Sequence, residues 1–281
     1  MATASEPVST VGPVGREATS NCCSAFYELD WVRQLAEDIF HPGGEALTRK
    51  TVAAMNLAPG AALVELGCGT GTSAMLLAEE FGLQVSAVDI SAVNIERAKK
   101  RAASFVERIR FQQADAQSLP FEPKEFDAAL AECTFSLFPD QAAALAEIRR
   151  VLKPGGHLAV TDMATGGPLP ADIAAVLAPW TCLADAVDQD AYVSRFEKSG
   201  FEVVEVADES VGLDEMVLAL KRKLLLLGVG RAMASQTVPD FDPAVVRHWL
   251  DRFKEEVDKG AIRYLRFQLS RKSGPSPQPP P

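Results

Sequence analysis

The stretch VELGCGTGTS, residues 64–73, joins a short apolar segment to an amphipathic one. The preceding segment AALVEL (61–66) is an apolar run rather than an alternating one, which is typical of a strand covered on both faces in a parallel sheet. The following segment SAMLLAEEF (73–81) has apolar residues at helical spacing. The turn between them contains Gly67, Gly69 and Gly71. Such a turn lets the backbone approach a ligand closely at the carboxyl end of a strand.

Strand and helix patterns alternate through the rest of the chain. The expected strands cover 61–66, 83–90, 109–115, 126–133, 157–163, 201–208 and 261–272. The expected helices cover 30–40, 45–57, 73–81, 91–105, 140–152 and 189–200, and 212–259 is mainly helical in pattern. Strands separated by helices predict an α/β fold. We expect a doubly wound, mainly parallel seven-stranded sheet with an N-terminal helical lid and a helical insertion before the last strand.

Composition and pattern divide the chain into five expected parts. A start rich in Ser, Thr, Pro and Gly and a Pro-rich end predict disordered termini. The predicted parts are a disordered arm (1–20), a helical lid with a cysteine doublet (21–58), the α/β core (59–207), a helical elaboration with the final strand (208–271) and a disordered tail (272–281).

The overall charge limits the partners that we expect. The chain has 281 residues, a net charge of −10 and a hydrophobic fraction of 47%. An acidic protein gains nothing from releasing phosphate counterions, so we expect neither nucleic acid nor an anionic membrane as a partner. No apolar run is long enough to span a bilayer, and the N-terminus lacks a secretory signal pattern. We therefore expect a cytoplasmic protein whose cysteines stay reduced.

The glycine spacing and two later carboxylates indicate a nucleoside ligand. A dinucleotide-binding loop needs a glycine where this chain has Thr72, and no Gly-Lys-Ser/Thr ending of a Walker loop follows. Asp89 ends the second expected strand, where it can accept both hydroxyls of a ribose. Asp115 ends the third, where it can accept from an adenine amino group. The alternative is that the glycines form only a tight turn and that both Asp residues cap helices.

The motifs ELGCGTG, AVDIS, QQADAQSLPF, FDAALAECTFSLF and VLKPGGHLAVTD occur in this order. Over residues 45–207 the chain thereby resembles the class I S-adenosylmethionine-dependent methyltransferases. The resemblance implies that Glu65 and the glycine-loop backbone hold the methionine portion of the cofactor and that Asp89 holds the ribose. It implies that Asp115 and Ala116 hold the adenine. The full set of implied cofactor-binding residues is Glu65, Gly67, Cys68, Gly69, Gly71, Thr72, Asp89, Ile90, Asp115, Ala116 and Glu132.

The methyl acceptor is less constrained by the cofactor motifs. Methyl transfer to oxygen or nitrogen often needs a base, and the chain has three histidines, His41, His157 and His248. His41 could reach the site from the lid, or it is simply a turn residue. We expect His157 to be structural, because it starts a strand on the side away from the ligand.

The positions of the cysteines give a second indication of which methyl acceptor the protein uses. Cys133 follows the fourth expected strand, Cys182 lies beyond the fifth, and the doublet Cys22 and Cys23 precedes the lid helices. Three segments can thus deliver thiols to one point, which suits a soft, thiophilic centre. The alternative is that each cysteine is a small buried hydrophobe.

The segments 133–170 and 180–201, with the upstream doublet, resemble the arsenite methyltransferases. The resemblance implies a trivalent metalloid substrate, arsenite or a methylated arsenical, and a thiol reductant as a partner. It implies that the catalytic, metalloid-binding residues are Cys22, Cys23, Cys133 and Cys182. That family's Tyr-Tyr-Gly stretch is missing, so antimonite, a selenium compound or a thiol remain alternative acceptors.

Catalysis on a thiol-bound metalloid needs mainly positioning, and apolar walls would favour loss of the sulfonium charge. Phe135, Phe138 and Trp180 are candidates for such walls, or they are plain core residues. Two other functions fit the same cofactor motifs. One is a small-molecule C- or O-methyltransferase of the quinone-biosynthesis kind, and the other is a metalloid-binding protein without turnover.

Overall fold

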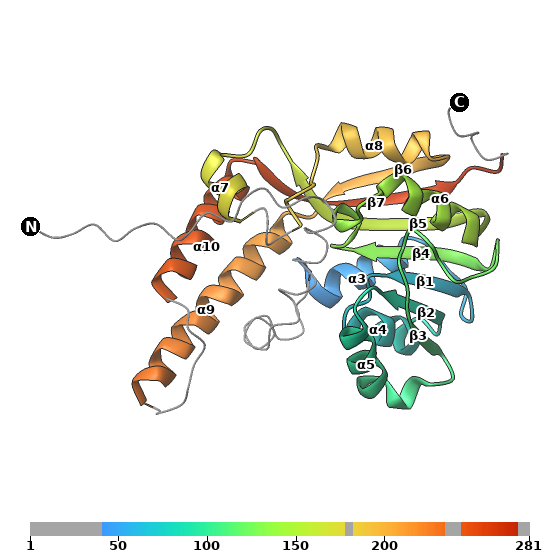
Figure 1. Ribbon diagram of the computed structural model, residues 1–281, viewed down its shortest axis with the longest axis horizontal. Coiled ribbons are helices and arrows are strands. Elements are labelled where there is room, and N and C mark those ends of the chain that lie inside the picture. Colours follow the sequence, from blue (N-terminus) through green and yellow to red (C-terminus); the bar gives the residue numbers. More distant parts are fainter. Residues whose placement is uncertain (1–40, 178–181, 234–242, 275–281) are drawn as a thin grey trace, which may run out of the picture.

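A seven-stranded sheet forms the centre of the protein (Figure 1), and the computed structural model describes residues 41–177, 182–233 and 243–274. The strand order is β3-β2-β1-β4-β5-β7-β6. The bounds are β1 Ala62–Leu66, β2 Gln84–Asp89, β3 Ile109–Gln113, β4 Phe126–Glu132, β5 Leu152–Thr165, β6 Phe201–Asp208 and β7 Ile262–Arg271. The first five strands pair in parallel, and β7 pairs antiparallel with both β5 and β6. The predicted doubly wound, mainly parallel sheet is confirmed.

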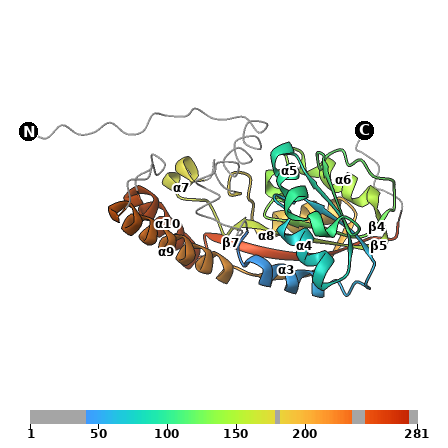
Figure 2. The same cartoon turned by 90° about the horizontal axis from the view of Figure 1, so that it is seen from below.

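Helices cover both faces of the sheet (Figures 1 and 2). One face carries α3 (Gly44–Ala53), α4 (Thr72–Glu80) and α5 (Ala92–Arg101), and the other carries α6 (Gln141–Val151) and α8 (Gln189–Lys198). A further group, α7 (Ala171–Val176), α9 (Val211–Met233) and α10 (Pro243–Asp258), lies beyond one edge of this sandwich. Short 3₁₀ turns occur at η1 (Ala103–Phe105) and η2 (Phe135–Leu137).

Side-chain caps start three of these helices. Ser91, Asp140 and Asp188 accept hydrogen bonds from the backbone N–H groups of Asn94, Ala143 and Ala191, at 3.1, 2.9 and 2.8 Å. Each cap satisfies a donor that the first helical turn leaves without a partner. Ser and Asp are among the residues preferred at such N-cap positions.

Some element boundaries differ from the predictions. The strand predicted at 157–163 extends over Leu152–Thr165, because its ladder with β7 continues to Thr165 and Leu152 pairs with Phe126 of β4. The helix predicted at 91–105 ends at Arg101, and the η1 turn follows. The short helix α7 was not predicted, and the helix predicted at 30–40 lies outside the described residues.

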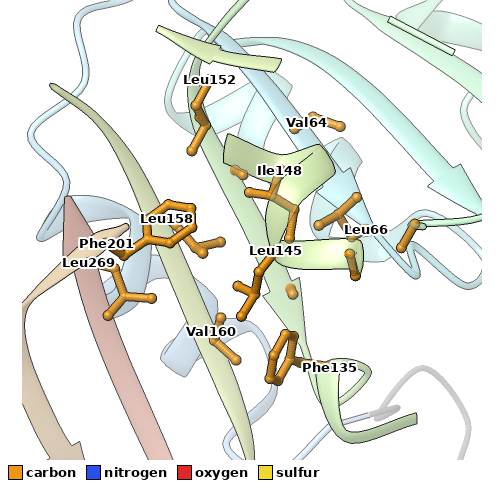
Figure 3. Packing of buried hydrophobic residues seen from close by; sticks show 14 of the residues in the cluster. Val64, Leu66, Phe135, Leu145, Ile148, Leu152, Leu158, Val160, Phe201 and Leu269 are labelled. Atoms are coloured by element: carbon orange, nitrogen blue, oxygen red, sulfur yellow. The ribbon is translucent and has the colours of Figure 1, made fainter. Parts of the chain in front are cut away.

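Aromatic and aliphatic side chains fill the layer between the sheet and α6 with α8. Figure 3 shows Leu145 and Ile148 of α6 packed toward Leu158 and Val160 of the sheet. Phe196 of α8 is fully buried there. Its ring centroid lies 5.4, 6.1 and 5.2 Å from those of Phe135, Tyr192 and Phe267. Phe135 is therefore a core residue rather than a pocket wall.

A separate apolar cluster joins the sheet to the extra helices. It contains Ile173 of α7, Leu213 of α9 and Phe253 of α10, packed with Met163 at the end of β5 and Tyr264 of β7. The helical elaboration thus packs where β5 leaves the sheet, which is the edge that carries the site described below. Within the described ranges, none of the helices is both long enough and apolar enough to cross a membrane.

We expect Phe196→Ala to lower the free energy of unfolding by about 3–5 kcal/mol, because it removes a buried ring and leaves a cavity. Urea denaturation measures this change. The matched control is Val204→Ala on the neighbouring strand β6, where Val204 is 66% exposed and the change should stay within about 0.5 kcal/mol. Equal, small effects of both variants would contradict the packing described.

Candidate functional site

A pocket lies at the carboxyl ends of the parallel strands and is lined by the loops that follow β1, β2, β3 and β4. Seven of the predicted cofactor-binding residues line it, namely Gly67, Gly69, Asp89, Ile90, Asp115, Ala116 and Glu132. Cys133 and Phe138 line the same pocket. The topology thus brings four loops, far apart in the sequence, to one place.

The glycine loop forms one wall of this pocket. Gly67 and Gly69 have φ angles of +66° and +52°, a region that side chains with a Cβ rarely adopt. A Cβ at Gly67 would overlap the side chain of Thr134, whereas a Cβ at Gly69 would meet no atom within 4 Å. Because Gly69 lines the pocket, its α-carbon borders open space in which a ligand can contact the backbone.

Backbone amides orient the two predicted nucleoside carboxylates. Asp89 is 8% exposed and accepts hydrogen bonds from the N–H groups of Gly69 and Ser91, both at 2.8 Å. Asp115 accepts from the backbone and side-chain nitrogens of Gln117, at 2.8 and 3.0 Å. Both carboxylates are therefore held in fixed positions at the pocket.

Glu65 lies behind the glycine loop and is 5% exposed. Its Oε2 atom has no hydrogen-bond partner among the described residues. Burial, together with the carboxylates of Glu132 and Asp89, raises the pKa of Glu65 well above its usual range. A buried acceptor in such an acidic group suits a cationic ligand. The ammonium and sulfonium groups of S-adenosylmethionine meet this requirement, so the residues present fit this cofactor.

Glu132, at the end of β4, is the centre of a polar cluster. Its carboxylate accepts from Thr48 Oγ1 at 2.9 and 3.2 Å and from Ser73 Oγ at 2.7 Å. His41 Nε2 lies 3.7 Å from Glu132 Oε2 and 3.3 Å from Thr48 Oγ1. His41 therefore lies at the site, as one of the two sequence interpretations allowed. Thr48 and Ser73 were missed, because a single hydroxyl on a helix gives no sequence signal.

Cys68, Gly71 and Thr72, which were also predicted to bind the cofactor, are not among the residues that line the pocket. The Cys68 side chain is buried in the apolar layer under α4, and burial raises the pKa of its thiol well above the usual range. Thr72 Oγ1 accepts from Arg101, which also donates to Thr70 Oγ1 at 2.6 Å. Gly71 packs so closely that a Cβ there would lie 2.8 Å from the Phe111 ring. These residues support the loop from outside the pocket.

Cys133 and Cys182 meet beside the pocket, as the sequence predicted. Their sulfur atoms are 3.2 Å apart, and Cys182 Sγ also donates to the backbone oxygen of Cys133 at 3.1 Å. A disulfide bond would be about 2.05 Å long, so the two cysteines do not form a disulfide with each other. Cys133 has a φ of +52°, and its N–H donates to Thr161 O at 2.7 Å. Such a strained residue persists only where its surroundings hold it, often at a functional site.

The predicted doublet Cys22 and Cys23 lies outside the described residues, as does Trp180. The third thiol of the proposed site therefore stays a prediction from sequence. Within the described part of the chain, Cys133 and Cys182 are the predicted thiols that come together.

Asp162 lies next to the thiol pair and was not predicted. It is fully buried and accepts from Ser136 N, Ser136 Oγ and Met163 N at 2.6, 2.9 and 2.7 Å. Its carboxylate and the two sulfurs all lie within 4.8 Å of one another. Burial raises the pKa of Asp162 to about 7, although these hydrogen bonds act to lower it. The sequence signal was an acid inside the apolar strand HLAVTDM.

The chain is similar to several known methyltransferases. A family model described as a methyltransferase domain matches residues 57–200, just over half of the chain. Methyltransferase GfsG of Streptomyces halstedii is 30% identical over 185 residues, which are 64% of this chain and 66% of that protein. O-methyltransferase cnsE of Penicillium expansum is 31% identical over 189 residues, 66% of this chain and 68% of that protein.

An arsenite methyltransferase of Halobacterium salinarum is 32% identical over 167 residues, 57% of this chain and 42% of that protein. The matches thus span between about two fifths and two thirds of the lengths of these relatives. Among solved structures, Haemonchus contortus phosphoethanolamine N-methyltransferase 2, in complex with phosphomonomethylethanolamine and S-adenosylhomocysteine, superposes with a TM-score of 0.77. It is 20% identical, and the match covers 90% of this chain and 60% of that one.

We expect Asp89→Ala to weaken binding of S-adenosylmethionine by about 1.5–3 kcal/mol, the scale for losing hydrogen bonds to a charged group. Titration calorimetry measures this loss. Glu79→Ala on the exposed face of α4 is the matched control and should bind as the parent does. Unchanged affinity in a folded Asp89→Ala variant would mean that a residue other than Asp89 binds the ribose.

We also expect Asp162 to make the stability of the metal-free, reduced protein depend on pH. Folding raises the pKa of Asp162 from 3.8 to about 7, so its contribution to stability is fully present below pH 3.8 and is lost as pH rises through about 7. Asp162→Asn lacks this ionisation. The unfolding free energy of the parent, relative to that of Asp162→Asn, should therefore fall between about pH 4 and pH 8. Urea denaturation across this range is the test, and a constant difference would contradict the assignment.

Proposed function

Because this chain belongs to the methyltransferase domain family and uses S-adenosylmethionine as its methyl donor, we propose that it methylates a thiol-bound trivalent metalloid, arsenite or a methylated arsenical. The observation that carries the proposal is the thiol pair. Two thiol sulfurs lie 3.2 Å apart, and one of them belongs to a residue that lines the cofactor pocket. The match to an arsenite methyltransferase supports this acceptor.

In this proposal different residues of the pocket bind different parts of the cofactor. Asp89 would accept the ribose hydroxyls, and Asp115 with Ala116 would hold the adenine. Glu65 would accept from the methionine ammonium, for which its Oε2 atom is available. When bound, S-adenosylmethionine supplies a methyl group on a positively charged sulfur. The acidic group of Glu65, Glu132 and Asp89 would favour this charged donor over the neutral product.

The acceptor would be held by the thiols. Each thiol that binds arsenite would form a sulfur–arsenic bond and pass its proton to a hydroxyl group on arsenic, which leaves as water. The arsenic lone pair would remain available to accept the methyl group. Cys133 and Cys182 would provide two sulfurs, with Cys22 or Cys23 as the predicted third. Accepting the methyl group through the lone pair takes arsenic from the trivalent to the pentavalent state. The thiol reductant would supply the two electrons that return arsenic to the trivalent state, and it would become a disulfide. Little acid–base chemistry is needed, so catalysis is mainly positioning.

The surroundings of the thiols suit a soft acceptor. Cys182 belongs to the apolar cluster that the extra helices form, with Leu137, Leu169 and Trp249 packed against the same cluster. An apolar wall favours a reaction in which the donor loses its positive charge. Phe138 lines the cofactor pocket nearby.

A second candidate is methyl transfer to a hydroxyl group of a small organic molecule. It is favoured by His41, which lies 3.7 Å from Glu132 at the edge of the pocket and can serve as a base that Glu132 orients. The match to O-methyltransferase cnsE supports it as well. In this case the thiol pair would have no direct part in the reaction.

We expect Cys133→Ser and Cys182→Ser each to abolish methylation of arsenite, because a site with fewer thiolates holds the arsenic poorly, and a misplacement of about 1 Å can cost ~100-fold in rate. Joint replacement of Cys22 and Cys23 by Ser should have the same effect. The measurement is methylated arsenic formed in the presence of arsenite, a thiol and S-adenosylmethionine.

Calorimetry should show nearly unchanged cofactor affinity in these variants. Cys68→Ala is the matched control, because it removes a thiol that faces the core, and it should keep the parent rate. Parent rates of arsenite methylation in both Cys133→Ser and Cys182→Ser would refute binding of the metalloid by this thiol pair. A parent protein that forms no methylated arsenic would refute the metalloid acceptor and favour the hydroxyl acceptor. Arsenic binding without turnover in the parent would indicate a binding protein.

A further inference from the structure

The thiol pair has a buried oxygen donor beside it that the proposed reaction does not use. We propose that Cys133, Cys182 and Asp162 form a binding site for a thiophilic divalent cation, of which Cd²⁺ and Zn²⁺ are representatives. The proposal shares its two thiols with the proposed function, but cation binding requires neither the cofactor nor methyl transfer.

The spacing of the three donors fits such an ion. One oxygen of Asp162 and the two sulfurs lie within 4.8 Å of one another, and the sulfurs are 3.2 Å apart. Tetrahedral zinc, with bonds of about 2.3 Å to sulfur and about 2.0–2.2 Å to oxygen, separates its ligand atoms by roughly 3.5 Å. The sulfurs would need to move slightly apart, and the carboxylate would need to move closer.

The carboxylate is oriented as a metal ligand usually is. Ser136 donates to it from both its N–H and its hydroxyl, and Met163 N–H donates as well. Carboxylates that bind metals are commonly fixed by such outer donors. Asp162 is fully buried, and a buried charge is costly unless a partner compensates it. A divalent cation bound by two thiolates and this carboxylate supplies that compensation.

A purely structural role explains only part of this arrangement. The bonds from Ser136 hold the η2 turn against the end of β5, and they would do so without any cation. They do not require two thiols beside the same carboxylate, nor the strained backbone of Cys133. The cation site accounts for all three features together.

Binding has a defined balance of atoms and charge. Two sulfur–metal bonds and one oxygen–metal bond form, and each thiol proton passes to the buffer. The cation would then occupy the place that the proposed function gives to the metalloid. A soft divalent cation should therefore inhibit methylation of arsenite competitively, if that reaction occurs.

The test is a titration with Cd²⁺ alone, in the full-length protein carrying Cys22→Ser and Cys23→Ser. This background is needed because the doublet could itself bind a soft cation. We expect one Cd²⁺ per chain, with an ultraviolet thiolate-to-cadmium absorption of the intensity that two thiolates give. Further replacement of Cys133 by Ser should halve this absorption and weaken binding.

Two more variants of this background test the oxygen donor. Ser136→Ala removes only an outer donor and should weaken Cd²⁺ binding by about 10-fold, whereas Asp162→Asn removes a ligand and should exceed the ~100-fold upper range of outer-donor effects. Circular dichroism checks that each variant is folded. If Asp162→Asn does not fold, the cadmium-113 NMR shift of the background protein still distinguishes sulfur and oxygen ligands from sulfur alone.

The proposal is overturned if the background protein binds no stoichiometric Cd²⁺, if a folded Asp162→Asn variant binds it as tightly as the background, or if the NMR shift indicates sulfur ligands only. These outcomes are separate from the fate of the proposed function. Cd²⁺ binding by two thiolates and Asp162 in a protein that does not methylate arsenite would support the cation site and refute the metalloid acceptor. Arsenite methylation by a protein that binds no Cd²⁺ at these residues would support the metalloid acceptor and refute the cation site.

Discussion

The parallel register of β1 with its two neighbours is the constraint on which the site depends. Leu66, the last residue of β1, pairs with Val88 of β2 and with Ala131 of β4. Because parallel strands point the same way, the next residues of all three strands emerge at one edge. The glycine loop, Asp89 and Glu132 are thereby neighbours in space. In the sequence, Glu132 lies 67 positions after Glu65, which directly precedes the last residue of β1. Any slip of this register would separate the loop from its carboxylates.

The same edge combines two chemically different halves. On the side of β1 and β2, the carboxylates of Glu65 and Asp89 are buried, and burial with neighbouring acids raises the pKa of Glu65. On the side of β4 and β5, two thiols lie against an apolar cluster. The first half suits a positively charged methyl donor, and the second suits a soft acceptor. Cys133 belongs to both, because it lines the cofactor pocket and contacts Cys182.

The sequence allowed much of the fold to be predicted, since buried strands read as apolar runs and helix starts carry Ser and Asp caps. Asp89, Asp115 and Cys133 could be located because they end such runs. The positions of Thr48 and Ser73 around Glu132 could not be predicted, because they depend on how α3 packs beside α4. Only His41 in this cluster had been named as a residue that could reach the site. Asp162 was missed for a similar reason, since its position beside two thiols follows from the meeting of β4, β5 and the segment at Cys182. The six-residue helix α7 is too short to give a periodic signal.

The proposed function requires that Cys133 and Cys182 bind the metalloid directly beside the cofactor. X-ray absorption at the arsenic edge, on the protein mixed with arsenite and S-adenosylhomocysteine, measures the atoms bonded to arsenic. We expect sulfur to replace oxygen as the neighbour of arsenic in the parent, and fewer sulfur neighbours to remain in Cys133→Ser and in Cys182→Ser. Arsenic that keeps only oxygen neighbours in the parent, or that has the same sulfur neighbours in both variants, would contradict it.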